Sequence, residues 1–127
     1  MRVIGHGIDL VEVSRIAGML ERHADRFMER VFTSAEAGHG ADTKRRAEHL
    51  AARFAAKEAV LKALGTGWSD GIAWTEIEVV RLPSGQPTLR LSGRASELAG
   101  DKGVQEWAIS ITHTETHAMA SVIAQGE

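Results

Sequence analysis

The sequence predicts an α+β fold in which one long helix packs on a largely antiparallel β-sheet. A helix-forming segment rich in Ala, Leu, Glu, Lys and Arg runs from Thr43 to Leu64 without an internal glycine or proline. Residues 75–91 and 106–124 instead carry the period-two patterns expected of strands. The resulting order of elements, β-α-α-α-β-β-α-β-β, is typical of α+β proteins.

Length and composition predict one compact domain over residues 1–127. The chain is 43% hydrophobic and 25% charged, with two prolines, and a chain of this size can bury roughly two thirds of its unfolded surface. It has no cysteine, which excludes disulfides and thiol catalysis and permits a reducing compartment such as the cytoplasm. A net charge of −2 argues against general nucleic-acid binding. The N-terminal apolar run is too short to signal a membrane span.

Helix and strand periods divide the rest of the chain. The expected elements besides the long helix, in chain order, are a strand over Arg2–Leu10, a helix from Glu12 to about His23, a short helix opened by the capping box Thr33–Glu36, a hairpin with strands Thr75–Leu82 and Thr88–Leu91, a helix over Gly93–Ala99, and strands over Glu106–Thr112 and Ala118–Ala124. In the first strand, Gly5 and Gly7 allow a neighbouring backbone to approach closely. Gly38 and Gly40 are expected to end the short helix.

Turn residues set the boundaries around the long helix and the hairpin. Gly65 is placed to end the long helix, because glycine tolerates the left-handed backbone of a C-terminal cap. The segment Pro83–Pro87 has the composition of a five-residue hairpin loop. The last two strands flank Thr114–Thr116, so the C-terminal half is predicted to be mostly sheet.

The long helix carries charged side chains beside its apolar face. At about 100° per residue, Glu58 and Lys62 lie on the border of an apolar stripe, four residues apart, as in an ordinary surface ion pair. Arg53 lies on the other border. Lys57 falls inside the stripe, where an unpaired ammonium is costly, so it either reaches past the stripe or has an anionic partner. The set suits a carboxylate-held cation beside a phosphate, but many surface helices carry a similar mixture.

Asp9 and His113 stand near the ends of expected strands. Asp9 can cap the following helix, pair with a buried base or bind a metal ion. Carboxylates from two separate elements, such as Asp9 and Glu58, form the open, water-completed kind of site that Mg²⁺ uses. His113 shares the strand face of Trp107 and is either a structural histidine or, with His117, half of a metal pair that lacks an evident third ligand.

Three arginines on the first expected helix are spaced seven and four residues apart. If that helix continues past His23, Arg15, Arg22 and Arg26 form one stripe. A stripe of this kind is either a solvated face or a docking strip for an acidic partner, because aligned arginines steer encounters and fix the register of a complex.

Three segments of the chain carry a family likeness: Gly7–Glu12, Arg53–Gly65 and Ser110–His113. The middle segment is the most specific, with the pattern Phe-x-x-Lys-Glu-Ala-x-x-Lys-x-x-Gly. In order and spacing, the segments resemble those of the holo-acyl-carrier-protein synthases, the short bacterial 4′-phosphopantetheinyl transferases. The resemblance covers nearly the whole chain and implies the fold of that family.

The resemblance also implies a reaction. It is the Mg²⁺-dependent transfer of the 4′-phosphopantetheine arm from coenzyme A to a serine of apo acyl carrier protein, which releases adenosine 3′,5′-bisphosphate and supports fatty acid biosynthesis. Mn²⁺ is an alternative metal. The resemblance implies a cytoplasmic homotrimer with active sites at the subunit interfaces, and no membrane or nucleic-acid partner.

Residue roles are implied by the matching motifs. Asp9, Glu58 and Lys62 are the expected catalytic residues, and the first two are the expected metal ligands. The expected coenzyme A contacts are Arg53, Lys62, Gly65, Thr66, Gly85, Pro87 and His113. Arg15, Arg22 and Arg26 are the expected carrier-protein docking residues.

Two other interpretations stay open on the residues alone. One is a non-enzymatic module that binds an acidic protein through the arginine stripe, with purely structural acids. The other is a metal-dependent phosphohydrolase that uses the same carboxylates to activate water.

Overall fold

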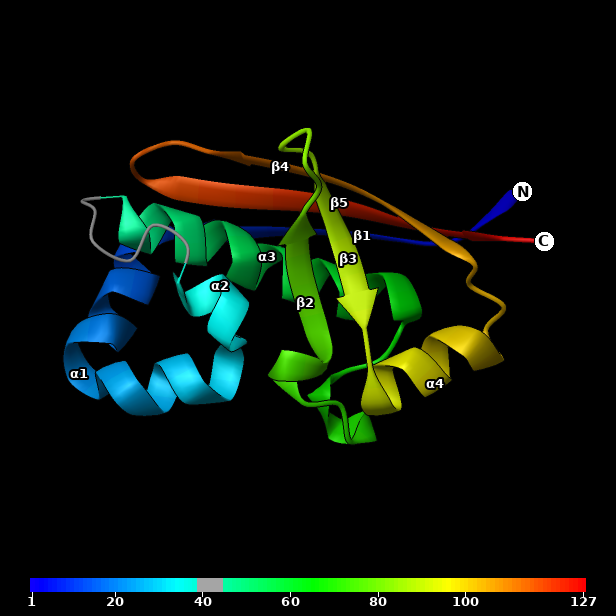
Figure 1. Ribbon diagram of the computed structural model, residues 1–127, viewed down its shortest axis with the longest axis horizontal. Coiled ribbons are helices and arrows are strands. Elements are labelled where there is room, and N and C mark those ends of the chain that lie inside the picture. The colour runs from blue at the N-terminus through cyan, green and yellow to red at the C-terminus, as the bar shows by residue number, and fades with distance from the viewer. Residues whose placement is uncertain (39–44) are drawn as a thin grey trace.

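The computed structural model, which describes residues 1–38 and 45–127, has the α+β architecture and the order of strands and helices that the sequence predicts (Figure 1). In chain order, the elements are β1 (Arg2–Glu12), α1 (Val13–Val31), α2 (Ser34–Gly38), α3 (Arg46–Leu64), the 3₁₀ turns η1 (Trp68–Asp70) and η2 (Trp74–Glu76), β2 (Ile77–Arg81), β3 (Pro87–Leu91), α4 (Gly93–Asp101), β4 (Glu106–His113) and β5 (His117–Gly126). The expected start of the long helix at Thr43, and the stop at Gly40, lie outside the described residues.

The strands form two antiparallel sheets. The larger sheet has the order β1-β5-β4, and the smaller one is the hairpin β2-β3. The hairpin begins later than expected, because Thr75 and Glu76 belong to η2. The Glu76 carboxylate accepts hydrogen bonds from the backbone N–H groups of Ala73 and Arg94, at 3.0 and 3.1 Å, and these bonds tie the turn to the start of α4.

Helix α3 is the centre of the core, and its burial is wider than one stripe. Its alanines from Ala51 onward are buried together with Leu50, Phe54 and Leu61. Gly5 and Gly7 of β1 face α3 so closely that an added Cβ atom would lie 1.9 Å from the carbonyl oxygens of Ala63 and Ala59, respectively. The close approach expected of these two glycines is therefore confirmed.

The larger sheet is covered on one face only. Figure 1 shows β1, β5 and β4 running along one side of α3, with every helix on that same side. The uncovered face carries Ile8, Leu10 and Met119, which are 49%, 62% and 37% exposed. In the part of the chain that the structure describes, no helix is long and apolar enough to cross a membrane.

Helix α1 is bent in the middle. It extends beyond the expected end to Val31, but His23 has non-helical backbone angles (φ −140°, ψ 33°). The second half turns so that Phe27 and Val31 are buried. The Phe27 ring meets Phe32 edge to face, with centroids 5.6 Å apart. The bend breaks the continuous helix on which the single stripe of Arg15, Arg22 and Arg26 depended.

Candidate active site

Strand β1 and helix α3 bring Asp9 and Lys62 into contact. Asp9 lies two residues beyond Gly7 on the face of β1 that packs on α3, because side chains alternate along a strand. Lys62 Nζ lies 3.3 Å from Asp9 Oδ1 and donates a hydrogen bond to the backbone carbonyl of Ile8 at 2.9 Å. Asp9 thus pairs with a base, but with an exposed one and not the buried base that was one of its expected partners. No side chain caps the start of α1.

Glu58 lies one helical turn before Lys62, and its surroundings disfavour its charge. Burial is the largest cause of a raised Glu58 pKa, and the negative charge of Asp9 is the second. The Trp68 indole N–H, Arg15 and Lys62 act in the opposite direction. Glu58 is therefore harder to ionise than an exposed glutamate, and the charge of Asp9 contributes to this.

The donor set of this site fits a cation with an incomplete protein shell. Among residues 1–38 and 45–127, no group of three or more His, Cys, Asp or Glu side chains could hold a metal ion by itself. Mg²⁺ is commonly bound by one or two carboxylates, with waters and substrate phosphates as its other ligands. Asp9 and Glu58 can supply those carboxylates, and a cation between them would relieve their repulsion.

An aromatic stack beside Glu58 was missed by the sequence reasoning. Trp68 stacks on Trp74 with ring centroids 3.8 Å apart, and Trp74 stacks on Phe54 at 4.8 Å. The Arg15 guanidinium lies 5.3 Å from the centre of the Phe54 ring. Phe54 and Glu58 are four residues apart on α3, which places them on the same helix face. This spacing was the one feature of the sequence that pointed to an aromatic ring beside Glu58. Arg15 therefore borders the carboxylate site as well as the α1 surface.

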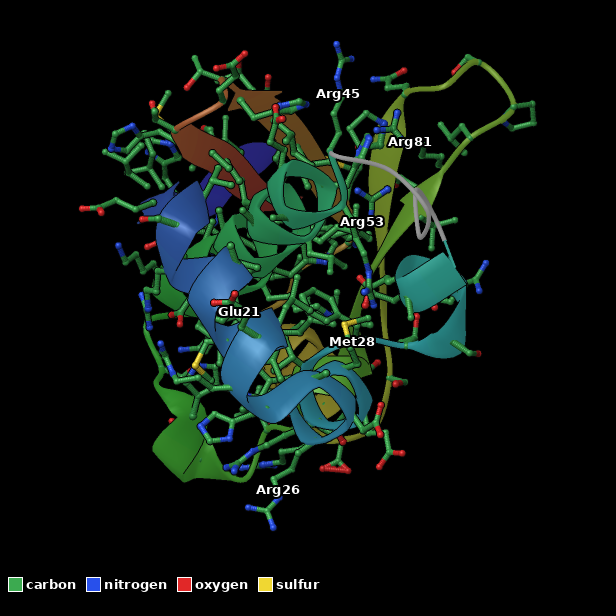
Figure 2. All side chains as sticks on the ribbon, turned by 90° about the vertical axis from the view of Figure 1, so that its left-hand side faces the viewer. Glu21, Arg26, Met28, Arg45, Arg53 and Arg81 are labelled. Carbon is green, nitrogen blue, oxygen red and sulfur yellow. The ribbon has the colours of Figure 1, made fainter. Side chains whose placement is uncertain are left out.

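Three of the predicted coenzyme A contacts, Arg53, Pro87 and His113, line a cavity of about 160 Å³ between α3, the hairpin and β4. His49, Arg53, Arg81 and His113 line it together with Pro87. Figure 2 shows Arg53 and Arg81 in the upper half of the view and Arg26 at the bottom. Asp9, Glu58 and Lys62 do not line this cavity. Arg81 was not predicted, because an arginine near the end of a strand carries no distinctive spacing.

The electrostatics of this cavity favour an anion. Arg53 is buried, and its pKa is lowered first by burial and then by the charge of Arg81. One Arg53 nitrogen donates to the backbone carbonyl of His49 at 3.2 Å, whereas its buried Nε has no hydrogen-bond partner. A phosphate group would supply the missing acceptor and offset the repulsion between the arginines.

The remaining predicted coenzyme A contacts lie at two further turns. Gly65 caps α3 with a left-handed backbone (φ 72°), as expected, and the hydroxyl of Thr66 is buried without a hydrogen-bond partner. Gly85 is exposed in the hairpin loop, where its carbonyl accepts a hydrogen bond from Arg81 at 2.8 Å. Arg53 and Glu58 are five residues apart on α3, and so point about 140° apart around the helix axis. A single chain thus presents the predicted contacts in separate places.

The three predicted docking arginines lie along the bent helix. Arg15 and Arg22 precede the bend at His23, and Arg26 follows it. Arg26 lines a largely apolar cavity of about 300 Å³ with Met19, Phe27 and Trp74. Basic and apolar side chains therefore meet at the second half of α1.

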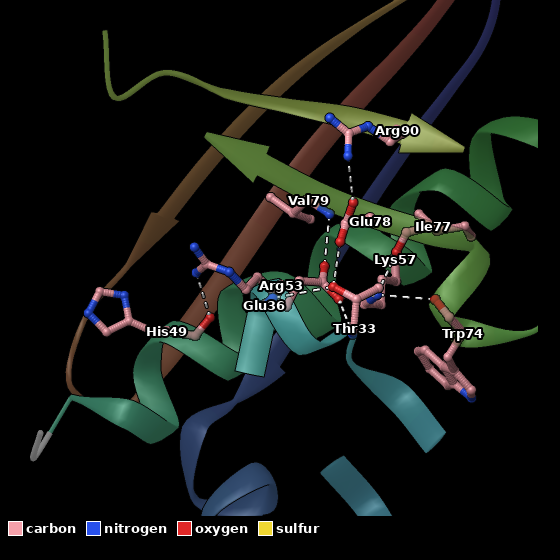
Figure 3. A network of polar contacts seen from close by, with 10 residues as sticks. All are labelled: Thr33, Glu36, His49, Arg53, Lys57, Trp74, Ile77, Glu78, Val79 and Arg90. Atoms are coloured by element: carbon pink, nitrogen blue, oxygen red, sulfur yellow. Dashed lines mark hydrogen bonds and ion pairs between the residues drawn. The ribbon is translucent and has the colours of Figure 1, made fainter. Parts of the chain in front are cut away.

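Lys57 lies inside the apolar stripe and has an anionic partner, which was one of the two alternatives expected for it (Figure 3). Its Nζ atom lies 2.7 Å from Glu36 Oε1 and also donates to the carbonyls of Trp74 and Ile77. The other Glu36 oxygen accepts the backbone N–H of Val79 at 2.8 Å. This buried ion pair joins α2, α3 and β2.

Comparison with known proteins agrees with the fold and the motifs. Residues 5–120 match the model of the 4′-phosphopantetheinyl transferase superfamily. The holo-[acyl-carrier-protein] synthase of Solibacter usitatus is 46% identical over 97% of this chain and 98% of its own. A crystal structure of such a synthase from Bacillus anthracis, in complex with CoA (3′,5′-ADP), has a TM-score of 0.80 at 35% identity and covers 98% of both chains. That of Helicobacter pylori, in complex with coenzyme A, has a TM-score of 0.83 at 29% identity, over 94% of this chain and 99% of the other. This chain belongs to the 4′-phosphopantetheinyl transferase superfamily.

Proposed function

We propose that this protein transfers the 4′-phosphopantetheine arm of coenzyme A to a serine of apo acyl carrier protein, with adenosine 3′,5′-bisphosphate as the second product. The proposal is supported by the contact of Lys62 with Asp9, one helical turn from Glu58, in a chain whose relatives are holo-[acyl-carrier-protein] synthases over nearly their whole length. We place the reaction in the cytoplasm, in support of fatty acid biosynthesis, and treat residues 1–127 as one transferase domain.

Asp9 and Glu58 are the residues that would hold Mg²⁺, with Mn²⁺ as an alternative. When bound, the metal supplies positive charge against the pyrophosphate of coenzyme A. Lys62 has three N–H donors and a half-exposed side chain, so it can turn from Asp9 to a phosphate oxygen. There it would offset the charge that develops on the leaving group. The serine oxygen bonds to phosphorus and its proton passes to a water molecule, as the bond between that phosphorus and the oxygen of the leaving adenosine 3′,5′-bisphosphate breaks. The chemistry is therefore mainly a matter of positioning and charge.

We further propose that the active site is completed between copies of the chain, in a homotrimer. Arg53, Pro87 and His113 line one cavity, whereas Gly65 and Thr66 follow the end of α3 that carries Lys62. Coenzyme A would contact both groups, along with Gly85, if they came from neighbouring subunits. The uncovered apolar face with Ile8, Leu10 and Met119 is of the kind that marks a protein interface.

The acidic carrier protein would dock on α1. Arg15, Arg22 and Arg26 supply positive charge, and the apolar cavity with Met19 and Phe27 supplies a surface to bury. Arg15 also borders Glu58, which would bring a docked serine near the carboxylates.

The test is to incubate the protein with coenzyme A, Mg²⁺ and an apo acyl carrier protein, and to weigh the carrier by mass spectrometry. A mass gain of one phosphopantetheine group is expected. Breakdown of coenzyme A without transfer would favour the phosphohydrolase, and carrier binding without either reaction would favour the binding module. A matched reaction without divalent metal tests the assignment of Mg²⁺.

A further inference from the structure

A carboxylate–histidine pair lies at the edge of the basic cavity. His113, the last residue of β4, has its Nδ1 atom 3.0 Å from Oε1 of Glu48 in the first turn of α3. The Glu48 side chain is 16% exposed and that of His113 is 32% exposed. The pair joins two elements that are 65 residues apart in the chain.

The position of Glu48 differs from that of its partner. His113 lines the cavity of about 160 Å³ with His49, Arg53 and Arg81, and Glu48 does not. A carboxylate inside a cavity of basic side chains would repel an anionic ligand. Glu48 instead contacts Nδ1 of the His113 imidazole, while the His113 ring borders the cavity.

We propose that Glu48 is a positioning residue for coenzyme A, which acts through His113. The carboxylate accepts the Nδ1–H of the imidazole and fixes the plane of the ring. An imidazole ring that carries hydrogen on both nitrogens has a second donor, Nε2–H, for a phosphate oxygen. Carboxylate partners commonly orient functional histidines in this way. The inference rests on the proposed function, in which His113 contacts coenzyme A.

Binding measurements on four proteins test the proposal: wild type, Glu48→Gln, His113→Gln and the double variant. Calorimetric titration of the full chain with coenzyme A should show weaker binding for Glu48→Gln, by about three- to tenfold, because the charge that favours the hydrogen bond is lost. The double variant should bind no more weakly than His113→Gln alone. In steady-state kinetics, Glu48→Gln should raise the KM for coenzyme A and leave kcat nearly unchanged.

The matched control is Glu97→Gln, because Glu97 is an exposed acid whose ion pair with Arg94 lies on α4. It should leave coenzyme A binding unchanged. Nitrogen-15 NMR of the wild-type His113 ring adds a measurement that needs no variant. Nδ1 should carry a proton with and without coenzyme A.

The outcomes separate this inference from the function on which it rests. Wild-type affinity in Glu48→Gln, with weak binding in His113→Gln, overturns the role of Glu48 and leaves the proposed function standing. An equal loss from Glu48→Gln in the presence and absence of His113 also overturns it, as does an unprotonated Nδ1. Unchanged coenzyme A binding in His113→Gln would show that His113 does not contact coenzyme A, and this also overturns the inference. The proposed function is then still tested separately, by transfer to the carrier protein measured by mass spectrometry.

Discussion

Removal of the Glu36 carboxylate should destabilise the fold by about 3–5 kcal/mol, the usual cost of breaking a buried ion pair by deleting one partner. Glu36 and Lys57 are 2% and 0% exposed. In Glu36→Ala the ammonium keeps only two backbone carbonyls, and the N–H of Val79 loses its acceptor. For a chain of this length, the loss corresponds to a fall in Tm of roughly 10–20 °C.

Urea unfolding followed by circular dichroism, at one fixed protein concentration, measures the effect. Glu97→Ala is the control, since it removes an acid whose side chain is 66% exposed and should cost no more than about 0.5 kcal/mol. The double variant Glu36→Gln/Lys57→Met should be more stable than Glu36→Ala, because neither member of the pair is left as an unpaired buried charge. The reasoning is refuted if Glu36→Ala unfolds within 1 kcal/mol of wild type (roughly the experimental spread).

Three further predictions concern Glu58, Gly7 and Arg22. Glu58→Gln should lower turnover by about 100-fold or more. Because the Glu58 pKa is raised in the fold, its ionisation costs stability as the pH rises through that pKa. The same variant should therefore unfold at a higher temperature than wild type near neutral pH, but not in acid below the usual glutamate pKa, and an equal Tm at every pH would contradict this. Gly7→Ala should cost about 2–3 kcal/mol in urea unfolding, since its Cβ would lie 1.9 Å from the Ala59 carbonyl oxygen; wild-type stability would count against the close packing. Arg22→Glu should weaken carrier binding more at low than at high salt, and a salt-independent effect would speak against docking on α1.

The sequence predicted the elements whose signals are local. The α3 segment has strong helix formers and a glycine cap, and the glycines at positions 5 and 7 indicated a close approach to β1, which the structure shows. The position of Lys57 inside the apolar stripe was also visible on the helical wheel, which left open whether the side chain is buried with an anionic partner. Its partner was not visible there, because Glu36 lies 21 residues away in the chain and no periodicity relates them.

What the sequence could not predict depends on tertiary contacts. The sequence indicated an end of the first helix at about His23, where the structure has the bend, but not the second helical half that brings Phe27 and Val31 into the core. The stacking of Trp68 on Trp74 likewise joins two short turns whose positions follow from the packing around them. The pairing of Glu48 with His113 requires the end of β4 to meet the start of α3.

Helix α3 connects stability to the proposed chemistry. Lys57 precedes Glu58 directly, and its hydrogen bonds to the carbonyls of Trp74 and Ile77 fix the rotation of α3 about its axis. A shift of the helix by one residue would turn each side chain by about 100° around the helix axis. The same shift would move Glu58 away from Asp9 and would move Arg53 out of its cavity. The buried ion pair therefore holds both halves of the proposed site in register, although none of its atoms lies in either half.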